Sequence, residues 1–224
     1  MRAEELSRSV QDYLKTIWLA QEWSPEAVTT TTLAQRMGLS PSTVSEAVKK
    51  LTAQGLVRRP GAGEIALTDR GREAAVQMVR RHRILETFLT GRLGYAWDEV
   101  HEEAEVLEHA VSEKFVARLD ALLGHPDRDP HGDPIPRRDG SVASAAAVPL
   151  ADVPAGTTVT VARVSDADPA LLRWLGGAGI RPGAELVLGE HGAPAGAVAV
   201  TIGGVVVEVG VLAAEAVWVL PATG

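Results

Sequence analysis

The densest group of potential metal ligands in the sequence is the segment HEEAEVLEH, residues 101–109. On a helix, four of its side chains fall along one face at spacings i, i+4, i+7 and i+8: His101, Glu105, Glu108 and His109. Imidazole nitrogens and carboxylate oxygens are donors that bind divalent transition metals. The spacing therefore predicts a metal site on this helix face.

A second pair of candidate ligands comes earlier, where His82 and Glu86 are spaced i, i+4 on or beside the apolar stripe of a predicted helix. A lone charged pair at such a position needs a partner, and a metal between the two helices would supply it. Taken singly, each group has an ordinary alternative, because Glu-rich helix faces are usually solvated and a histidine on an apolar face is usually a core residue. HEEAE differs from the metalloprotease pattern, which needs His at position 105.

The composition limits what could hold a metal. The sequence has no cysteine, so a disulfide framework, a thiolate site and a zinc finger are excluded, and only His, Asp and Glu remain as ligands. The net charge of −7 argues against a protein that coats nucleic acid non-specifically. Basic and acidic residues number ten and nine over residues 1–75, nine and thirteen over 76–139, and three and seven over 140–224. The first segment can therefore approach phosphate, and the middle one has spare carboxylates.

Neither the start of the sequence nor any later stretch has the pattern of a secretion or membrane segment. The first residues, MRAEELSRSVQDYL, lack the apolar core of a signal peptide, and no later run approaches the length of a membrane span. We therefore expect a cytoplasmic protein with no membrane partner.

The elements that position these residues begin with a helix predicted from about Glu4 to Glu22, with Asp12 beside its apolar stripe. Farther on, Gly38 can close a short helix in the left-handed conformation, and Ser40 can cap the next helix, with Pro41 at its first position. This order predicts a helix-turn-helix. The inward side chains of its second helix are Val44, Val48 and Leu51.

The segment LVRRPGAGEIALT predicts two short strands around a Pro-Gly-Ala-Gly turn, which is the wing of a winged helix. Helix pairs joined by a Gly turn also occur in bundles that bind no nucleic acid, but a wing with arginines at its base favours DNA. For Thr29 to Thr32, a capping role is favoured over phosphate binding. The predicted DNA-contacting residues are Ser42, Thr43, Ser45 and Glu46 on base edges, Lys49, Arg58 and Arg59 on phosphates, and Ser40 at the helix start.

The rest of the chain shows helical patterns from Asp69 through Leu89 and from about Trp97 to Leu123, long enough to form a dimer interface. Between Gly124 and Gly156 the composition shifts to Pro, Gly, Ala and Asp, which predicts a linker without regular structure. Apart from helix signals around Pro169 to Leu175, the last segment consists of runs such as TTVTVARV, AELVLGE, AVAVTIGG and VVVEVG. These runs predict a small β-barrel.

In content and order, these features resemble the diphtheria toxin repressor family, including its manganese transport regulator branch, over essentially the whole chain. The resemblance is carried by QDYLKTIW, SPSTVSEAVKKL before the wing, RRHRILETFL, VHEEAEVLEH and PHGDPIP before the β-rich end. It implies a metal-activated repressor, not an enzyme, that binds double-stranded operator DNA as a homodimer. The implied fold class is α+β, with a winged helix-turn-helix DNA-binding domain over residues 1–75, a helical metal-binding and dimerisation domain over 76–140, a linker over 141–150 and a small SH3-like β-barrel over 151–224.

The resemblance also implies two metal sites. The primary site would comprise Asp12, Glu105, Glu108 and His109, and the ancillary site would comprise His82, Glu86 and His101. In family members with an SH3-like domain, that domain lends further ligands to the ancillary site, and Asp168 lies where one is expected. The neighbouring ligand position is Leu171, so either the ancillary site is one ligand short or a group such as Asp166 or water completes it.

Iron-responsive members of the family place sulfur ligands at the positions of Asp12 and Glu105, where this sequence has oxygen donors. Mn²⁺ suits carboxylate, imidazole and water ligands, so we predict Mn²⁺ as the cofactor, with Fe²⁺ or another divalent transition metal as the alternative. Lys15 replaces a carboxylate found in the short manganese branch, which argues against a paired-metal arrangement.

Two alternative functions stay open at this point. The first is a winged-helix regulator that binds an organic effector in its dimer interface, with the carboxylates merely solvated. The second, less favoured, is a metal-dependent hydrolase, for which the sequence offers no nucleophile motif or phosphate loop. On the reading we favour, no organic substrate is expected.

Overall fold

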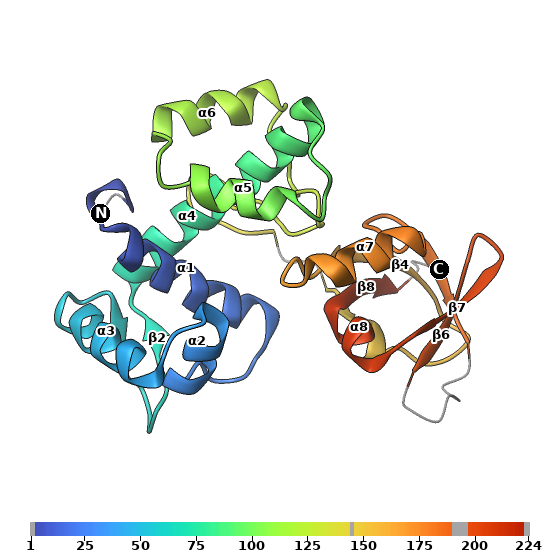
Figure 1. Cartoon of the computed structure of the whole chain (residues 1–224), viewed down its shortest axis with the longest axis horizontal. Helices are drawn as coiled ribbons and strands as arrows, with labels where there is room; N and C mark the ends of the chain where they lie inside the picture. The colour runs from blue at the N-terminus through green and yellow to red at the C-terminus, as the bar shows by residue number, and fades with distance from the viewer. Residues whose placement is uncertain (1–2, 144–145, 190–196, 222–224) are drawn as a thin grey trace. The chain divides into compact units, whose positions relative to one another are not determined.

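The computed structural model describes residues 3–143, 146–189 and 197–221. The chain divides into two compact units, and Figure 1 labels most of their helices and strands. The first unit comprises residues 1–82, 108–114 and 136–141, and the second comprises residues 83–107, 115–135 and 142–224. Among the described residues, no helix is both long enough and apolar enough to cross a membrane.

The first unit opens with the 3₁₀ turn η1 (Ala3–Glu5) and the helix α1 (Arg8–Trp23). Ser7 caps α1, because its side chain accepts the backbone N–H of Val10 at 3.4 Å while its own backbone is extended. The prediction of one helix from Glu4 is therefore wrong at its beginning. The predicted apolar stripe of the helix is confirmed, since Leu14 and Ile17 are fully buried.

The predicted helix-turn-helix is confirmed in α2 (Thr30–Met37) and α3 (Pro41–Ala53). Gly38 ends α2 in the left-handed conformation with φ 64°, a backbone angle that glycine adopts without steric cost. Ser40 caps α3. Thr29 and Thr32 cap the start of α2 reciprocally, as the predicted capping role requires. Three inward residues of α3 are buried as predicted: Val44, Val48 and Leu51.

The predicted wing is also present, as an antiparallel pair of β1 (Val57–Arg58) and β2 (Ala66–Leu67). The long helix α4 (Asp69–Phe88) follows it directly. Gly71 allows this close approach, because a Cβ atom there would overlap the backbone carbonyl of Leu56. The lack of a side chain at Gly71 therefore allows α4 to pack against the backbone of Leu56, just before β1.

The helical part of the second unit is more broken than predicted. A π-helical turn, η2 (Leu89–Leu93), follows α4, and the expected helix from Trp97 to Leu123 consists of α5 (Val100–Leu107) and α6 (Glu113–Leu122). At the break, the carbonyl of Glu108 accepts the Arg81 guanidinium at 2.9 Å, and residues 108–110 form a turn.

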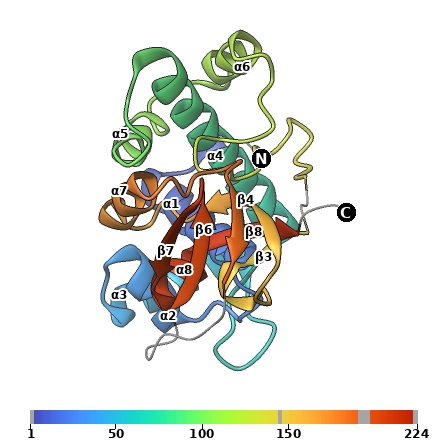
Figure 2. The same ribbon diagram turned by 90° about the vertical axis from the view of Figure 1, so that its right-hand side faces the viewer.

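The C-terminal part of the second unit is an antiparallel sheet, in which the described strands are ordered β3-β8-β4-β5-β6-β7 (Figure 2). The strands are β3 (Val148–Pro149), β4 (Thr158–Val164), β5 (Glu185–Leu188), β6 (Val198–Ile202), β7 (Val205–Val209) and β8 (Val217–Pro221). The short helices are η3 (Leu150–Asp152), α7 (Pro169–Gly177) and α8 (Val211–Ala216). Valines of β4 and leucines of α7 share one buried core. The β-rich runs and the helix at Pro169 were predicted correctly, and α8 was not expected.

The Pro-rich segment after α6 has no helix or strand among residues 123–143, as predicted, but it is not a solvated linker. The prediction is wrong farther on, where β3 and η3 lie within the predicted linker. His131 is fully buried, and its carbonyl accepts the N–H of Val164 at the end of β4, at 2.9 Å. The next residue, Gly132, has φ 88° and lies against the backbone of Ala162 and Arg163. Residues 144 and 145 of the predicted linker lie outside the described residues.

We expect Gly132→Ala to destabilise the protein by about 2 kcal/mol or more, because the new Cβ would meet the Ala162 carbonyl at a positive φ that alanine disfavours. Urea unfolding of the metal-free protein followed by circular dichroism measures the change. Gly124→Ala is the matched control, because Gly124 also has a positive φ, 77°, but open space around it. Equal losses in the two variants would contradict the steric explanation.

Candidate metal centre

A buried carboxylate, that of Glu108, is the centre of a polar cluster in the first unit. Its Oε1 accepts the Lys15 ammonium of α1 at 2.7 Å, and its Oε2 lies 2.6 Å from Nδ1 of His82 on α4. The side chain of Glu108 has no exposed surface. Two helices and the turn after α5 therefore meet at one carboxylate.

The charge state of Glu108 follows from these contacts. Burial alone would raise its pKa, but the hydrogen bond and charge of His82, together with Lys15, lower the pKa to about 2. The carboxylate is therefore anionic at neutral pH. The contact between Lys15 and Glu108 is not predicted from the sequence.

Asp12 and His109 lie beside Glu108. Nε2 of His109 is 3.0 Å from Oδ1 of Asp12 and 3.6 Å from Oε1 of Glu108, and the donor atoms of the three residues all lie within 4.8 Å of one another. Two carboxylate oxygens and an imidazole nitrogen form a donor set suited to a divalent transition metal. The structure thus brings together three of the four residues predicted for the primary site.

The fourth predicted residue, Glu105, lies on α5, and its Oε1 is 3.6 Å from Nε2 of His101 on the same helix. Because α5 ends at Leu107, Glu108 and His109 belong to the turn that follows. The prediction that all four ligands share one helix face is therefore wrong. The Glu108 carbonyl in this turn accepts the Arg81 guanidinium.

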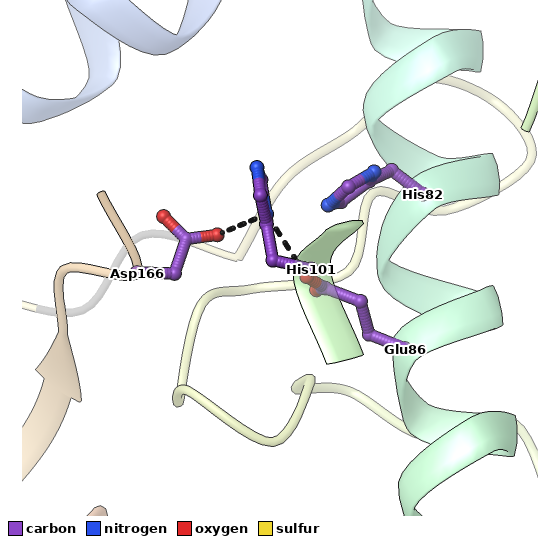
Figure 3. Close-up of side chains that lie close together, drawn as sticks. All are labelled: His82, Glu86, His101 and Asp166. Atoms are coloured by element: carbon purple, nitrogen blue, oxygen red, sulfur yellow. Dashed lines mark hydrogen bonds and ion pairs between the residues drawn. The ribbon is translucent and has the colours of Figure 1, made fainter. Parts of the chain in front are cut away.

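Glu86 of α4, His101 of α5 and Asp166 after β4 form a second polar cluster, in the second unit. Figure 3 shows the His101 ring between the two carboxylates, with Nδ1 at 3.3 Å from Glu86 and 2.9 Å from Asp166. Burial would lower the pKa of His101, but Asp166 and Glu86 raise it to about 10. Burial would likewise raise the pKa of Asp166, but His101 lowers it to about 2. These donors also suit a divalent cation.

Two residues predicted for the ancillary site also have partners of another kind. Nδ1 of His82, one turn before Glu86, is directed to Glu108 in the first unit. Asp168 caps α7, where its Oδ1 accepts the N–H groups of Ala170 and Leu171 at 2.8 and 3.2 Å. Asp166, which sequence reasoning had named as an alternative, is the carboxylate beside His101.

Two buried residues that the sequence analysis does not predict as ligands, Asp129 and His131, lie next to Glu86. Both are in or beside the motif PHGDPIP. Nε2 of His131 lies 2.6 Å from the Trp97 carbonyl and so must donate, which directs Nδ1 toward Glu86 Oε2 at 3.8 Å. Nδ1 has no hydrogen-bond partner among the described residues. Burial and the neighbouring carboxylates of Asp133 and Glu86 raise the pKa of Asp129 well above its usual value. A cation bound beside Glu86 would stabilise the ionised form of the Asp129 carboxyl.

The outer face of α3 carries the residues predicted to contact DNA. Glu46 and Lys49 form an ion pair of 3.7 Å that is mostly exposed, and such pairs contribute little to stability, so it can open to a ligand. At the start of α3, the Ser40 hydroxyl lies 2.8 Å from the hydroxyls of Ser42 and Thr43. Of the other predicted residues, Arg58 and Arg59 are exposed and Ser45 is half-buried.

Comparison with known families accounts for most of the chain. Residues 5–62 match the N-terminal DNA-binding domain of the iron-dependent repressors, and residues 68–137 match their metal-binding and dimerisation domain. Residues 148–221 match the FeoA domain. The iron-dependent repressor IdeR of Mycobacterium leprae is 34% identical over 215 residues, covering 89% of this chain and 91% of that protein. This chain belongs to the iron-dependent repressor family.

Solved structures of relatives agree with this assignment. A manganese-dependent transcriptional repressor in complex with manganese is 53% identical, with a TM-score of 0.91, and the match covers 95% of this chain and 99% of that one. The manganese regulator SloR is 36% identical, with a TM-score of 0.81 and coverage of 95% and 98%.

The predicted resemblance and the predicted α+β fold are thereby confirmed. This family member is a metal-dependent DNA-binding transcriptional repressor and not an enzyme, which excludes the hydrolase alternative. Its DNA-binding and dimerisation domains imply operator DNA and a second copy of the chain as partners.

The geometry gives Asp166 and Asp168 different roles, which substitution by asparagine separates. We expect Asp166→Asn to weaken one Mn²⁺-binding step about tenfold or more, because the carboxylate beside His101 loses its charge. Asp168→Asn should leave every Mn²⁺-binding step unchanged, since asparagine also caps helices well. Isothermal titration calorimetry measures both variants. If Asp168→Asn weakened a Mn²⁺-binding step and Asp166→Asn did not, the roles assigned to the two residues would be reversed.

Proposed function

We propose that this repressor responds to Mn²⁺ and acts in the cytoplasm on double-stranded operator DNA, which it binds as a homodimer once metal is bound. The observation that carries the proposal is that α1 contributes Asp12 to a cluster completed by Glu108 and His109 from far along the chain. A bound divalent cation would supply the positive charge that holds these ligands together.

The choice of Mn²⁺ is supported by the donor set and by the relatives. The residues at both clusters offer oxygen and nitrogen only, and Mn²⁺, low in the Irving–Williams order, suits such ligands. The relative that is 53% identical is described as manganese-dependent. Fe²⁺ is the second candidate, because the relative from Mycobacterium leprae is named an iron-dependent repressor.

The proposed mechanism depends on fixing α1 before DNA binds. When Asp12 is held to Glu108 and His109, the winged-helix unit loses internal freedom that DNA binding would otherwise have to remove. Affinity for the operator therefore rises without new base contacts, and by linkage DNA tightens metal binding by the same factor. In this proposal α3 enters the major groove, with Ser42, Thr43, Ser45 and Glu46 at base edges and Lys49, Arg58 and Arg59 at phosphates.

The helices of the second unit provide a face for the homodimer. Large apolar side chains on η2, α5 and α6 are exposed to solvent: Leu93 at 59%, Val106 at 66%, Phe115 at 45% and Leu122 at 59%. Phe115 and Leu122 are seven residues apart on α6 and so lie on one side of that helix. A second copy of the chain would bury them.

Metal gating is tested by fluorescence anisotropy of a labelled operator selected from random DNA, titrated with protein in chelator, in Mn²⁺ and anaerobically in Fe²⁺. We expect Mn²⁺ to strengthen binding tenfold or more, which is about 1.4 kcal/mol of coupling. In Asp12→Asn the gain should disappear, because the cluster loses one of its two carboxylate charges.

The matched control is Glu22→Gln, which removes one carboxylate from the same helix away from the cluster and should retain the gain. Buffered free concentrations of the two ions decide between Mn²⁺ and Fe²⁺. Equal affinity in chelator and in metal would refute metal gating and favour an organic effector.

The dimer face is tested with Leu122→Glu, which places a charge among the exposed apolar side chains and should raise the dimer dissociation constant at least tenfold. Sedimentation equilibrium in the presence of Mn²⁺ measures it. Ala121→Glu adds the same charge to the neighbouring exposed position and should leave the dimer intact. If both variants stay dimeric, this face is not the interface.

A further inference from the structure

Gln11 is a buried polar residue of α1, next to Asp12, and the predicted ligand sets do not include it. Its side-chain amide makes three contacts in the first unit. Nε2 lies 2.8 Å from the Ala3 carbonyl and 3.1 Å from the Leu6 carbonyl, and Oε1 lies 2.7 Å from Nδ1 of His109. Only 5% of Gln11 is exposed, so water does not replace these partners.

The three contacts fix the orientation of the amide by hydrogen-bond logic alone. Two backbone carbonyls can only accept, so the NH₂ group of Gln11 must face Ala3 and Leu6. The amide oxygen must then face His109, and an oxygen there requires that Nδ1 of the ring carry the proton. This holds in every protonation state that the ring can adopt in this contact.

The remaining ring nitrogen, Nε2, is the one that faces Asp12 at 3.0 Å and Glu108 at 3.6 Å. A ring whose Nδ1 is held by Gln11 cannot turn Nδ1 toward the carboxylates without leaving the amide oxygen unpaired in a buried site. Gln11 therefore determines both the rotation of the imidazole and the nitrogen that it presents to the cluster.

We propose that Gln11 is a positioning residue for the metal ligand His109, acting through the Nδ1–H···Oε1 hydrogen bond. This inference rests on the proposed function of the cluster and identifies the residue that orients one of its ligands. Partners that fix a ligating histidine through its second nitrogen typically contribute tenfold to a hundredfold in metal affinity.

Gln11 could instead matter only because it holds the N-terminal turn η1 against α1. The structure offers a control for that explanation, since Gln77 of α4 also holds this turn, accepting the Ala3 N–H at 3.0 Å. No contact between Gln77 and His109 is present among the described residues. The two glutamines therefore share the tethering role and differ in the histidine contact.

The experiment compares Gln11→Leu, Gln11→Glu and Gln77→Leu for Mn²⁺ affinity by competition with a metal-binding dye, and for melting temperature in chelator. The Mn²⁺-binding step that is measured is the one that Asp12→Asn abolishes. Gln11→Leu should weaken that step tenfold to a hundredfold. Gln11→Glu keeps an acceptor for Nδ1 and should stay within about threefold of the unmodified chain, although it loses both donor contacts to the turn. Gln77→Leu should leave Mn²⁺ affinity unchanged.

Proton NMR of the protein loaded with diamagnetic Zn²⁺ gives a second readout. A slowly exchanging imidazole N–H of His109 should be visible in the unmodified chain and in Gln11→Glu, and absent in Gln11→Leu. Equal Mn²⁺ losses in Gln11→Leu and Gln77→Leu, or an unchanged N–H signal in Gln11→Leu, would overturn the positioning role alone. If the unmodified chain has no Mn²⁺-binding step that depends on Asp12, the proposed function itself fails.

Discussion

The first unit is organised by the need to stabilise one buried negative charge. A carboxylate removed from water costs several kcal/mol unless charged or hydrogen-bonding partners compensate for it, and Glu108 is completely buried. Its partners come from separate segments, with Lys15 on α1 and His82 on α4. Satisfying this carboxylate therefore fixes α1 and α4 against the turn that follows α5. Asp12 and His109 are brought within contact distance as a consequence.

The second unit repeats the same constraint around Glu86, whose side chain is also buried. Here the compensating groups are His101 from α5 and His131 from the Pro-rich segment, while Asp166 approaches from the end of β4. The Pro-rich segment can reach this position because its backbone is anchored to β4 by the Val164 N–H. The same carboxylate and imidazole groups are donors that suit a divalent ion, which would take over the role of the imidazole charges.

The sequence predicts the structure well where a single residue type determines the local backbone geometry. It predicts less where contacts between distant residues determine where a helix ends or which side chain is buried. Gly38 and Ser40 specify a helix end and a helix start, so the helix-turn-helix could be predicted. The end of α5 at Leu107 could not, because the spacing of the segment HEEAEVLEH is helical through His109. Asp168 is predicted as a ligand, whereas in the structure it caps α7, a role that Asp followed by Pro favours. His131 was missed because its burial depends on the approach of Gly132 to β4.

The position of Lys15 bears on how many cations the first cluster can hold. Asp12 and Glu108 supply two negative charges, and the Lys15 ammonium 2.7 Å from Glu108 already balances one of them. Each divalent ion would add two positive charges to this largely buried group, where His82 also compensates Glu108. Because like charges at such separations repel strongly in a low-dielectric interior, the arrangement favours one ion rather than two. Lys15 thus works as a permanent cation beside this cluster.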